Sequence, residues 1–191
     1  ERKKLATRES LALAALRLAA EQGLENLRVQ DITDMVNVSR RTFTNYFSCK
    51  EEAIASLNTD RAARAAEALR ERPAGEPLAD SLAEVFAAQY RLATGMDRER
   101  LGPLRMVLSS PALQGEYLKT LVQSEEPLAK AIAERTGADP QRDLYPRVLA
   151  AAVTAAVRAA TGHWVDNNAT GSLPDLIRQA VRQIAGTPNK R

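Results

Sequence analysis

The sequence predicts an all-α protein, and two features of its composition support this prediction. Alanine, the residue that favours helix most, occupies 34 of the 191 positions. Aromatic residues make up only 4% of the chain, and runs of β-branched residues are scarce, so strands are disfavoured. With 45% hydrophobic residues the chain can bury a substantial core. We expect about nine helices, arranged as a small N-terminal helix-turn-helix domain and a larger C-terminal helical domain.

Apolar spacing, capping residues and helix breakers place these helices along the chain. The expected ranges are 5–22, 28–36, 40–46, 49–69, 78–94, 98–108, 110–136, 142–165 and 173–185. Pro127 should kink or divide the seventh helix, because proline lacks the backbone N–H that an internal helical turn needs. Pro73, Gly75 and Pro77 give the clearest break in the chain. We expect one domain over 1–50 and a second over 51–191, with the tail after Gly186 disordered.

The most informative stretch is 29–50, where two short helical patterns meet at a turn. Asn37 can adopt the left-handed backbone that a sharp corner needs, and Ser39 is a good N-cap for the next helix. That helix is expected to turn Phe43 and Phe47 inward. Polar side chains suited to contact with nucleic acid follow within eleven residues: Arg40, Arg41, Thr42, Asn45, Tyr46 and Lys50. This pattern is typical of a helix-turn-helix whose second helix enters a DNA major groove.

The charge distribution agrees with this location. The net charge of +3 is only mildly basic. Residues 1–50 hold nine Lys or Arg and six Asp or Glu, whereas 51–191 hold eighteen of each sign. The whole excess of positive charge therefore lies in the segment that carries the motif.

The same stretch resembles the TetR family of bacterial repressors. The residues that carry the resemblance are Val29-Gln-Asp-Ile, Asn37-Val-Ser, and Thr42-Phe-Thr-Asn-Tyr-Phe followed by Ser-Cys-Lys-Glu. The Thr-Phe-x-Asn-Tyr-Phe form is similar to actinobacterial members, including the regulator type of mycofactocin systems. Asn37 stands where the family usually has glycine, and Arg28 where it prefers a capping threonine.

We expect eight residues to contact DNA. Arg40 and Arg41 start the reading helix, where an arginine fork can bond both acceptors of a guanine. Tyr46 would donate its hydroxyl to a phosphate, and Lys50 would join the amides at the next helix start in an anion site. The alternatives are a solvated arginine pair and a half-buried packing tyrosine. The full set is Arg28, Gln30, Arg40, Arg41, Thr42, Asn45, Tyr46 and Lys50.

The resemblance also implies a ligand pocket in the second domain. A mostly apolar lining suits a fatty or aromatic effector, and similar family members are associated with acyl-CoA. For each lining residue, ordinary core packing is the competing interpretation. The expected ligand residues are Phe86, Tyr90, Arg105, Met106, Tyr117, Leu121 and Trp164. The alanine-rich eighth helix and the ninth are expected to form a homodimer interface, although the alanine face could instead pack within one subunit.

Catalytic and metal chemistry find little support. His163 and Cys49 are the only histidine and the only cysteine, and they fall in different parts of the chain. No zinc-ligand spacing and no glycine-rich phosphate loop occur. We therefore expect no enzyme, metal or cofactor. The single cysteine fits a reducing cytoplasm, and the nearly apolar run 148–157 is too short to span a membrane, so a soluble cytoplasmic protein is expected.

Two functions remain in competition. The first is a ligand-responsive regulator, most simply a homodimeric repressor that binds a palindromic operator and is released by an apolar or acyl-CoA-like effector. The second is a small-molecule or lipid carrier that keeps the fold without sequence-specific DNA binding. DNA affinity that falls steeply with salt would favour the first, because phosphate contacts release counterions.

Overall fold

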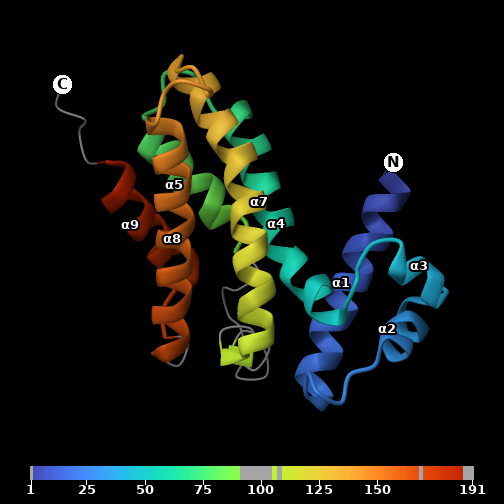
Figure 1. Cartoon of the computed structure of the whole chain (residues 1–191). Coiled ribbons are helices and arrows are strands. Elements are labelled where there is room, and N and C mark those ends of the chain that lie inside the picture. Colours follow the sequence, from blue (N-terminus) through green and yellow to red (C-terminus); the bar gives the residue numbers. More distant parts are fainter. Residues whose placement is uncertain (1, 91–104, 107–108, 168–169, 187–191) are drawn as a thin grey trace. The chain divides into compact units, whose positions relative to one another are not determined.

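The structure is a computed structural model that describes residues 2–90, 105–106, 109–167 and 170–186. Over these ranges all regular structure is helical, which confirms the expected all-α class (Figure 1). The helices are α1 (Arg2–Gln22), α2 (Val29–Val36), α3 (Arg40–Thr44), α4 (Lys50–Glu71), α5 (Leu78–Ala88), α7 (Pro111–Thr136), α8 (Tyr145–Asp166) and α9 (Leu173–Ala185). The helix expected over 98–108, the end of the one expected over 78–94, and the tail after Gly186 fall largely or wholly outside the described residues.

The chain divides into two compact units. The first unit contains residues 1–58 and 102–120, and the second contains residues 59–101 and 121–191. The division therefore falls inside α4 and α7, which contribute residues to both units. Each unit has its own set of buried apolar side chains.

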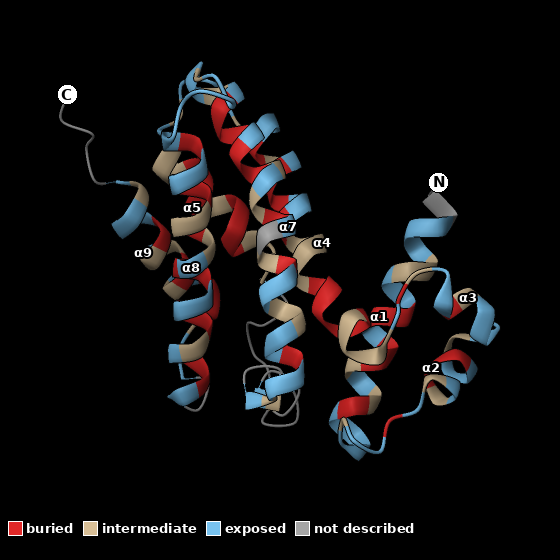
Figure 2. Cartoon of the chain, in the orientation of Figure 1, coloured by how far each residue is buried: buried red, intermediate tan, exposed pale blue. Residues whose placement is uncertain are grey.

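The first unit is built around a core that α1, α2, α3 and the start of α4 share. Leu11, Ile32, Phe43 and Ile54, one from each helix, are at most 2% exposed. Alanines on the inner face of α1 let the other helices approach closely. The burial pattern alternates along each helix, as amphipathic helices require (Figure 2).

In the second unit, α9 packs against both α5 and α8. Leu82, Val153 and Ile177 are fully buried there. Trp164 is 2% exposed, and its indole N–H donates to the carbonyl oxygen of Gly171 at 3.0 Å. That bond satisfies the one polar atom of a buried tryptophan and fixes the turn between α8 and α9.

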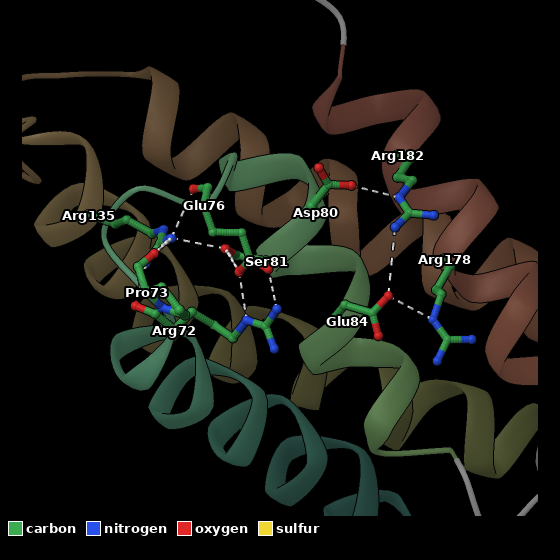
Figure 3. A network of polar contacts seen from close by, with 9 residues as sticks. All are labelled: Arg72, Pro73, Glu76, Asp80, Ser81, Glu84, Arg135, Arg178 and Arg182. Atoms are coloured by element: carbon green, nitrogen blue, oxygen red, sulfur yellow. Dashed lines mark hydrogen bonds and ion pairs between the residues drawn. The ribbon is translucent and has the colours of Figure 1, made fainter.

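Ion pairs reinforce the apolar contact between α5 and α9 (Figure 3). The Arg178 guanidinium lies 2.9 Å from the Glu84 carboxylate, and Arg182 lies 2.9 Å from Asp80. These four side chains lie one helical turn apart on each helix, so they fix the register between α5 and α9.

The proline-rich turn between α4 and α5 is held by one side chain from the end of α7 (Figure 3). Nη1 of Arg135 donates to the carbonyl of Arg72 at 3.0 Å. Its Nη2 faces the carbonyls of Pro73 at 2.6 Å and Glu76 at 3.0 Å, and the hydroxyl oxygen of Ser81 at 3.0 Å. A guanidinium has five donors in a fixed fork, which suits it to this set of acceptors.

Glu76 completes this network. Its carboxylate accepts hydrogen bonds from the Arg72 guanidinium and from the hydroxyl of Ser81, which is fully buried. These two donors, Arg72 foremost, lower the pKa of Glu76 from its ordinary value of 4.5 to about 2. The carboxylate therefore stays ionised at any physiological pH.

Two expectations, one about α7 and one about α8, need correction. The sequence predicted that Pro127 kinks or divides α7. This helix runs through Pro127 without a break, so the division does not occur. Leu128 and Ile132, which follow it, are fully buried, and this packing holds the helix together past the missing N–H.

The second correction concerns α8. Its 22 residues are long and apolar enough to cross a membrane by length and composition, so the run 148–157 understated the apolar stretch. Half of that stretch is buried inside the structure. Burial of this kind is what the core helix of a folded domain shows, and one such helix is weak evidence for a membrane span.

Candidate nucleic-acid interface

The short helix α3 is fixed from beneath by two aromatic rings. Phe43 and Phe47 are 1% and 2% exposed, and their ring centroids lie 5.5 Å apart. Tyr46 packs at the edge of this pair, with its centroid 6.3 Å from that of Phe47. Because this face is tied to the core, the opposite face of α3 must point away from it.

The turn into α3 has the geometry that the sequence predicted. Asn37 has φ 55° and ψ 52°, in the left-handed region, and its N–H donates to the carbonyl of Asp34 at 3.1 Å. Ser39 caps α3, accepting a hydrogen bond from the N–H of Thr42 at 3.1 Å. The two hydroxyls of Ser39 and Thr42 also lie 2.9 Å apart. Both local predictions, the turn at Asn37 and the cap at Ser39, are confirmed.

The outer face of α3 carries Arg40, Arg41 and Asn45, all exposed. Arg41 and Asn45 are four residues apart, so their side chains lie on the same side of the helical turn. Among the described residues, neither arginine forms an ion pair. These donors are therefore free to meet a partner, whereas Thr42 is half-buried and shares its hydroxyl with the cap.

The start of α2 offers a second, smaller set of donors. Arg28 and Gln30 are exposed there. Asp31 caps the helix, since its carboxylate accepts from the backbone N–H of Arg28 at 2.9 Å. The Gln30 amide donates to the carboxylate of Asp34 at 2.7 Å, so it must exchange that bond before it contacts anything else.

Lys50 contacts backbone carbonyls in the segment that precedes α2. Its ammonium donates to the carbonyl oxygens of Leu24 at 2.6 Å and Leu27 at 2.8 Å. The end of α4 on which it lies is capped instead by Glu52, whose carboxylate accepts from the Ser48 N–H at 2.7 Å and from its hydroxyl at 2.6 Å. The Lys50 ammonium is thus bonded within the protein, and its contact with a phosphate stays a prediction.

The expected ligand residues divide between the two units. Arg105, Met106 and Tyr117 belong to the first unit, where Met106 packs against the core of α1 to α4. Arg105 is exposed and Tyr117 is half-buried. Three of the seven expected ligand residues therefore belong to the unit that also holds the helix-turn-helix.

The other four lie in the second unit. Phe86 and Trp164 are 4% and 2% exposed and belong to its core. Tyr90 and Leu121 are half-buried, and the Arg61 guanidinium lies 5.1 Å from the centroid of the Tyr90 ring. Whether any of these residues lines a ligand pocket stays a prediction.

The clusters of titratable residues give no sign of a metal centre. Over the residues that the structure describes, no three His, Cys, Asp or Glu side chains gather in a way that could hold a metal ion.

The polar network around Arg135 and Glu76, which the sequence did not predict, is formed by contacts within the protein. No local spacing signals that network, because its members lie far apart in the sequence.

Comparisons with known proteins identify both parts of the chain. The family described as "Bacterial regulatory proteins, tetR family" matches residues 11–57, and "MftR C-terminal domain" matches residues 72–188. The HTH-type transcriptional regulator TcmR of Streptomyces glaucescens is 34% identical over 172 residues, which cover 86% of this chain and 75% of that protein.

Solved structures agree on the fold. A putative TetR-family regulator from Rhodococcus sp. matches with a TM-score of 0.58 and 21% identity, covering 94% of this chain and 98% of that one. The fatty acid degradation regulator FadR of Bacillus halodurans matches with a TM-score of 0.57 and 16% identity, covering 97% of both chains.

These matches decide the class of protein. The family consists of regulators and not of enzymes, and the part of the chain that reads as a helix-turn-helix is the part that the first family matches. The second match agrees with the resemblance to mycofactocin-type regulators. The chain belongs to the TetR family of DNA-binding transcriptional regulators.

Proposed function

We propose that this protein is a homodimeric repressor that binds a palindromic operator through α3 and is released from it by a small apolar or acyl-CoA-like effector. The observation that carries the DNA-binding part is the exposed set of Arg40, Arg41 and Asn45 opposite the buried Phe43 and Phe47. A helix anchored on one face and bearing unpaired donors on the other suits insertion into a major groove.

The chemistry of these side chains suits base edges and phosphates in different ways. Arg40 and Arg41 present forked donors that match the two acceptors of guanine, each pair worth about 1–3 kcal/mol of discrimination. Asn45 can bond adenine in the same way. Thr42, Tyr46 and the flanking Arg28 and Gln30 suit phosphate oxygens, which fix orientation and carry no sequence information.

A dimer interface on α8 and α9 is supported by an exposed row of small and apolar residues. Val148 is 54% exposed, and Ala151, Ala155 and Ala159 follow it at helical spacing, the first half-buried and the other two exposed. Ile184 adds a 42% exposed apolar side chain from α9. Small residues let helices of two subunits approach closely, and a two-fold dimer suits a palindromic operator.

The effector is proposed to bind the second unit. Phe86, Tyr90, Leu121 and Trp164 supply apolar surface there, which suits a fatty or aromatic molecule. Release from DNA requires only that the effector binds the non-binding conformation more tightly than the binding one. A repressor of this kind acts in the cytoplasm.

The decisive experiment selects bound sequences from random DNA and then titrates the selected duplex by fluorescence anisotropy between 50 and 200 mM salt. For 6–10 phosphate contacts the affinity should fall by about 10³–10⁵ over this range. Repeating the titration with acyl-CoA esters of increasing chain length tests induction. Selection of a two-fold symmetric site, with release by one ester, supports every part of the proposal.

Other outcomes separate its parts. A selected DNA site without two-fold symmetry would contradict binding of a palindromic operator by a homodimer. Unchanged DNA affinity at saturating ester would contradict release by this effector class. Binding of an ester without selection of any DNA sequence would favour the carrier instead.

A further inference from the structure

Lys50, the first residue of α4, makes two hydrogen bonds to residues that lie far before it in the sequence. Its ammonium lies 2.6 Å from the carbonyl oxygen of Leu24 and 2.8 Å from that of Leu27. Both acceptors belong to the segment 23–28 that links α1 to α2, and the contacts span 26 and 23 positions of sequence. Hydrogen bonds from a charged donor are roughly twice as strong as those between neutral groups.

These bonds close a ring around the DNA-reading motif. Between Leu27 and Lys50 lie the whole of α2, the turn at Asn37 and the whole of α3. A contact between the two ends of a segment removes much of the freedom with which that segment can open. The ends of the helix-turn-helix are thus tied to each other by one side chain.

Each end of the ring is itself held in place. The Leu27 side chain is 2% exposed and belongs to the core, and the next residue's N–H is bonded to Asp31 at the start of α2. At the other end, Phe47 is buried and Ser48 is bonded to Glu52. The Lys50 ammonium therefore connects two well-packed parts of the first unit. Its hydrogen bonds fix the start of α2 relative to the start of α4.

We propose that Lys50 is a positioning residue for operator binding, which holds the two ends of the helix-turn-helix together by capturing the Leu24 and Leu27 carbonyls and does not bind phosphate. This inference rests on the proposed use of α2 and α3 as the DNA-contacting surface. In this role the Lys50 side chain keeps Arg28 and Gln30 at a fixed distance from the residues of α3.

Salt dependence separates this role from a phosphate contact. Loss of one phosphate contact lowers the slope of log affinity against log salt by about 0.9, whereas loss of positioning lowers the affinity and leaves the slope unchanged. We expect Lys50→Met to weaken operator binding about tenfold with the wild-type slope, as loss of charged hydrogen bonds predicts. Lys50→Arg, which can donate to the same two carbonyls, should restore most of the affinity. Arg28→Gln is the matched control for a lost phosphate contact.

Amide hydrogen exchange gives an independent measure in the absence of DNA. In Lys50→Met the amides of 28–32 should exchange faster than in the wild type, while those of α8 stay unchanged. A slope lowered by about 0.9 with unchanged exchange at 28–32 would overturn the proposal, because that is the signature of a phosphate ligand.

If Lys50→Met fails to fold, the wild-type protein can be used to test whether the Lys50 ammonium binds the carbonyls or a phosphate. Nitrogen-15 NMR of the lysine ammonium groups, assigned with Lys50→Arg, should show a slowly exchanging Lys50 signal that added operator does not shift. A signal that appears or moves only with DNA would contradict the inference. If wild type selects no DNA at all, the proposed function fails, and the exchange and ammonium measurements still report on the tie itself.

Discussion

Arg135 and Ser81, 54 positions apart in sequence, meet through a hydrogen bond of 3.0 Å from the guanidinium to the serine hydroxyl oxygen. Ser81 is fully buried, and its hydroxyl donates a hydrogen bond to the Glu76 carboxylate. The same guanidinium nitrogen also faces two carbonyls of the turn before α5. One arginine therefore bonds three carbonyls of that turn and the Ser81 hydroxyl.

Arg135→Ala should lower the free energy of unfolding by about 1–3 kcal/mol, because it leaves partly buried acceptors without a donor. Urea unfolding followed by circular dichroism measures this. Lys130→Ala, which removes a cation one turn earlier on α7 from an exposed pair with Glu126, is the control and should cost less than about 0.5 kcal/mol. Equal losses in the two variants would contradict the role given to Arg135.

The stability of the fold should decline in acid in a way that depends on Glu76. Its pKa is lowered in the folded protein from 4.5 to about 2, chiefly by the Arg72 guanidinium and then by the Ser81 hydroxyl. The contribution is therefore fully present above about pH 5 and is lost as the pH falls toward 2. Glu76→Gln should reduce the fall of the urea unfolding midpoint between pH 5 and 3. Glu71→Gln, at an exposed residue outside the network, should leave this pH dependence unchanged.

Substitution of Arg41 should affect DNA binding and not folding. Arg41→Ala should weaken operator binding by about 1–3 kcal/mol, roughly 5- to 150-fold. Its melting temperature should match that of the wild type, since the side chain is exposed and forms no ion pair among the described residues. Arg17→Ala, which removes the same charge from α1, controls for the change in net charge. Similar losses in both would argue for a general electrostatic effect.

The left-handed backbone at Asn37 predicts which residues fit there. Asn37→Gly should change the stability by less than about 0.5 kcal/mol, because glycine adopts positive φ without strain. Asn37→Val should cost about 1–2 kcal/mol, since a β-branched side chain is disfavoured in this region. Thermal unfolding of the two variants tests this, and a stable valine variant would show that the turn has changed conformation.

A charge placed on the proposed dimer face should separate the subunits. Ala159 is exposed on α8, so Ala159→Glu should leave the monomer folded while shifting the sedimentation coefficient from dimer to monomer. Ala63→Glu, at an exposed alanine of α4, introduces the same group elsewhere and should leave the assembly intact. A dimeric Ala159→Glu protein would place the interface on another surface.

Sequence alone predicted what local chemistry determines. The left-handed Asn37, the Ser39 cap and the inward Phe43 and Phe47 depend on neighbours within a few positions, and all four are as expected. At Pro127 the local rule allowed a kink or a division, and the helix is not divided, because burial of the following turn outweighs one missing hydrogen bond.

Long-range partners could not be predicted in this way. A lysine at the start of a helix suits a phosphate as well as a carbonyl, and the carbonyls that Lys50 contacts lie 23 and 26 positions away in the sequence. The acceptors of Arg135 lie 54 to 63 positions away, so no spacing within α7 reveals them.

The residues that hold α3 in place differ from those that it exposes, and this has an evolutionary consequence. Arg40, Arg41 and Asn45 contribute little to holding the helix in place, because Phe43, Phe47 and the Ser39 cap do so. After gene duplication, a copy can therefore acquire mutations at the three outward positions one at a time and remain a viable protein at every step. Because these three positions are the proposed contacts with bases, such a copy would reach a new set of target genes through folded intermediates.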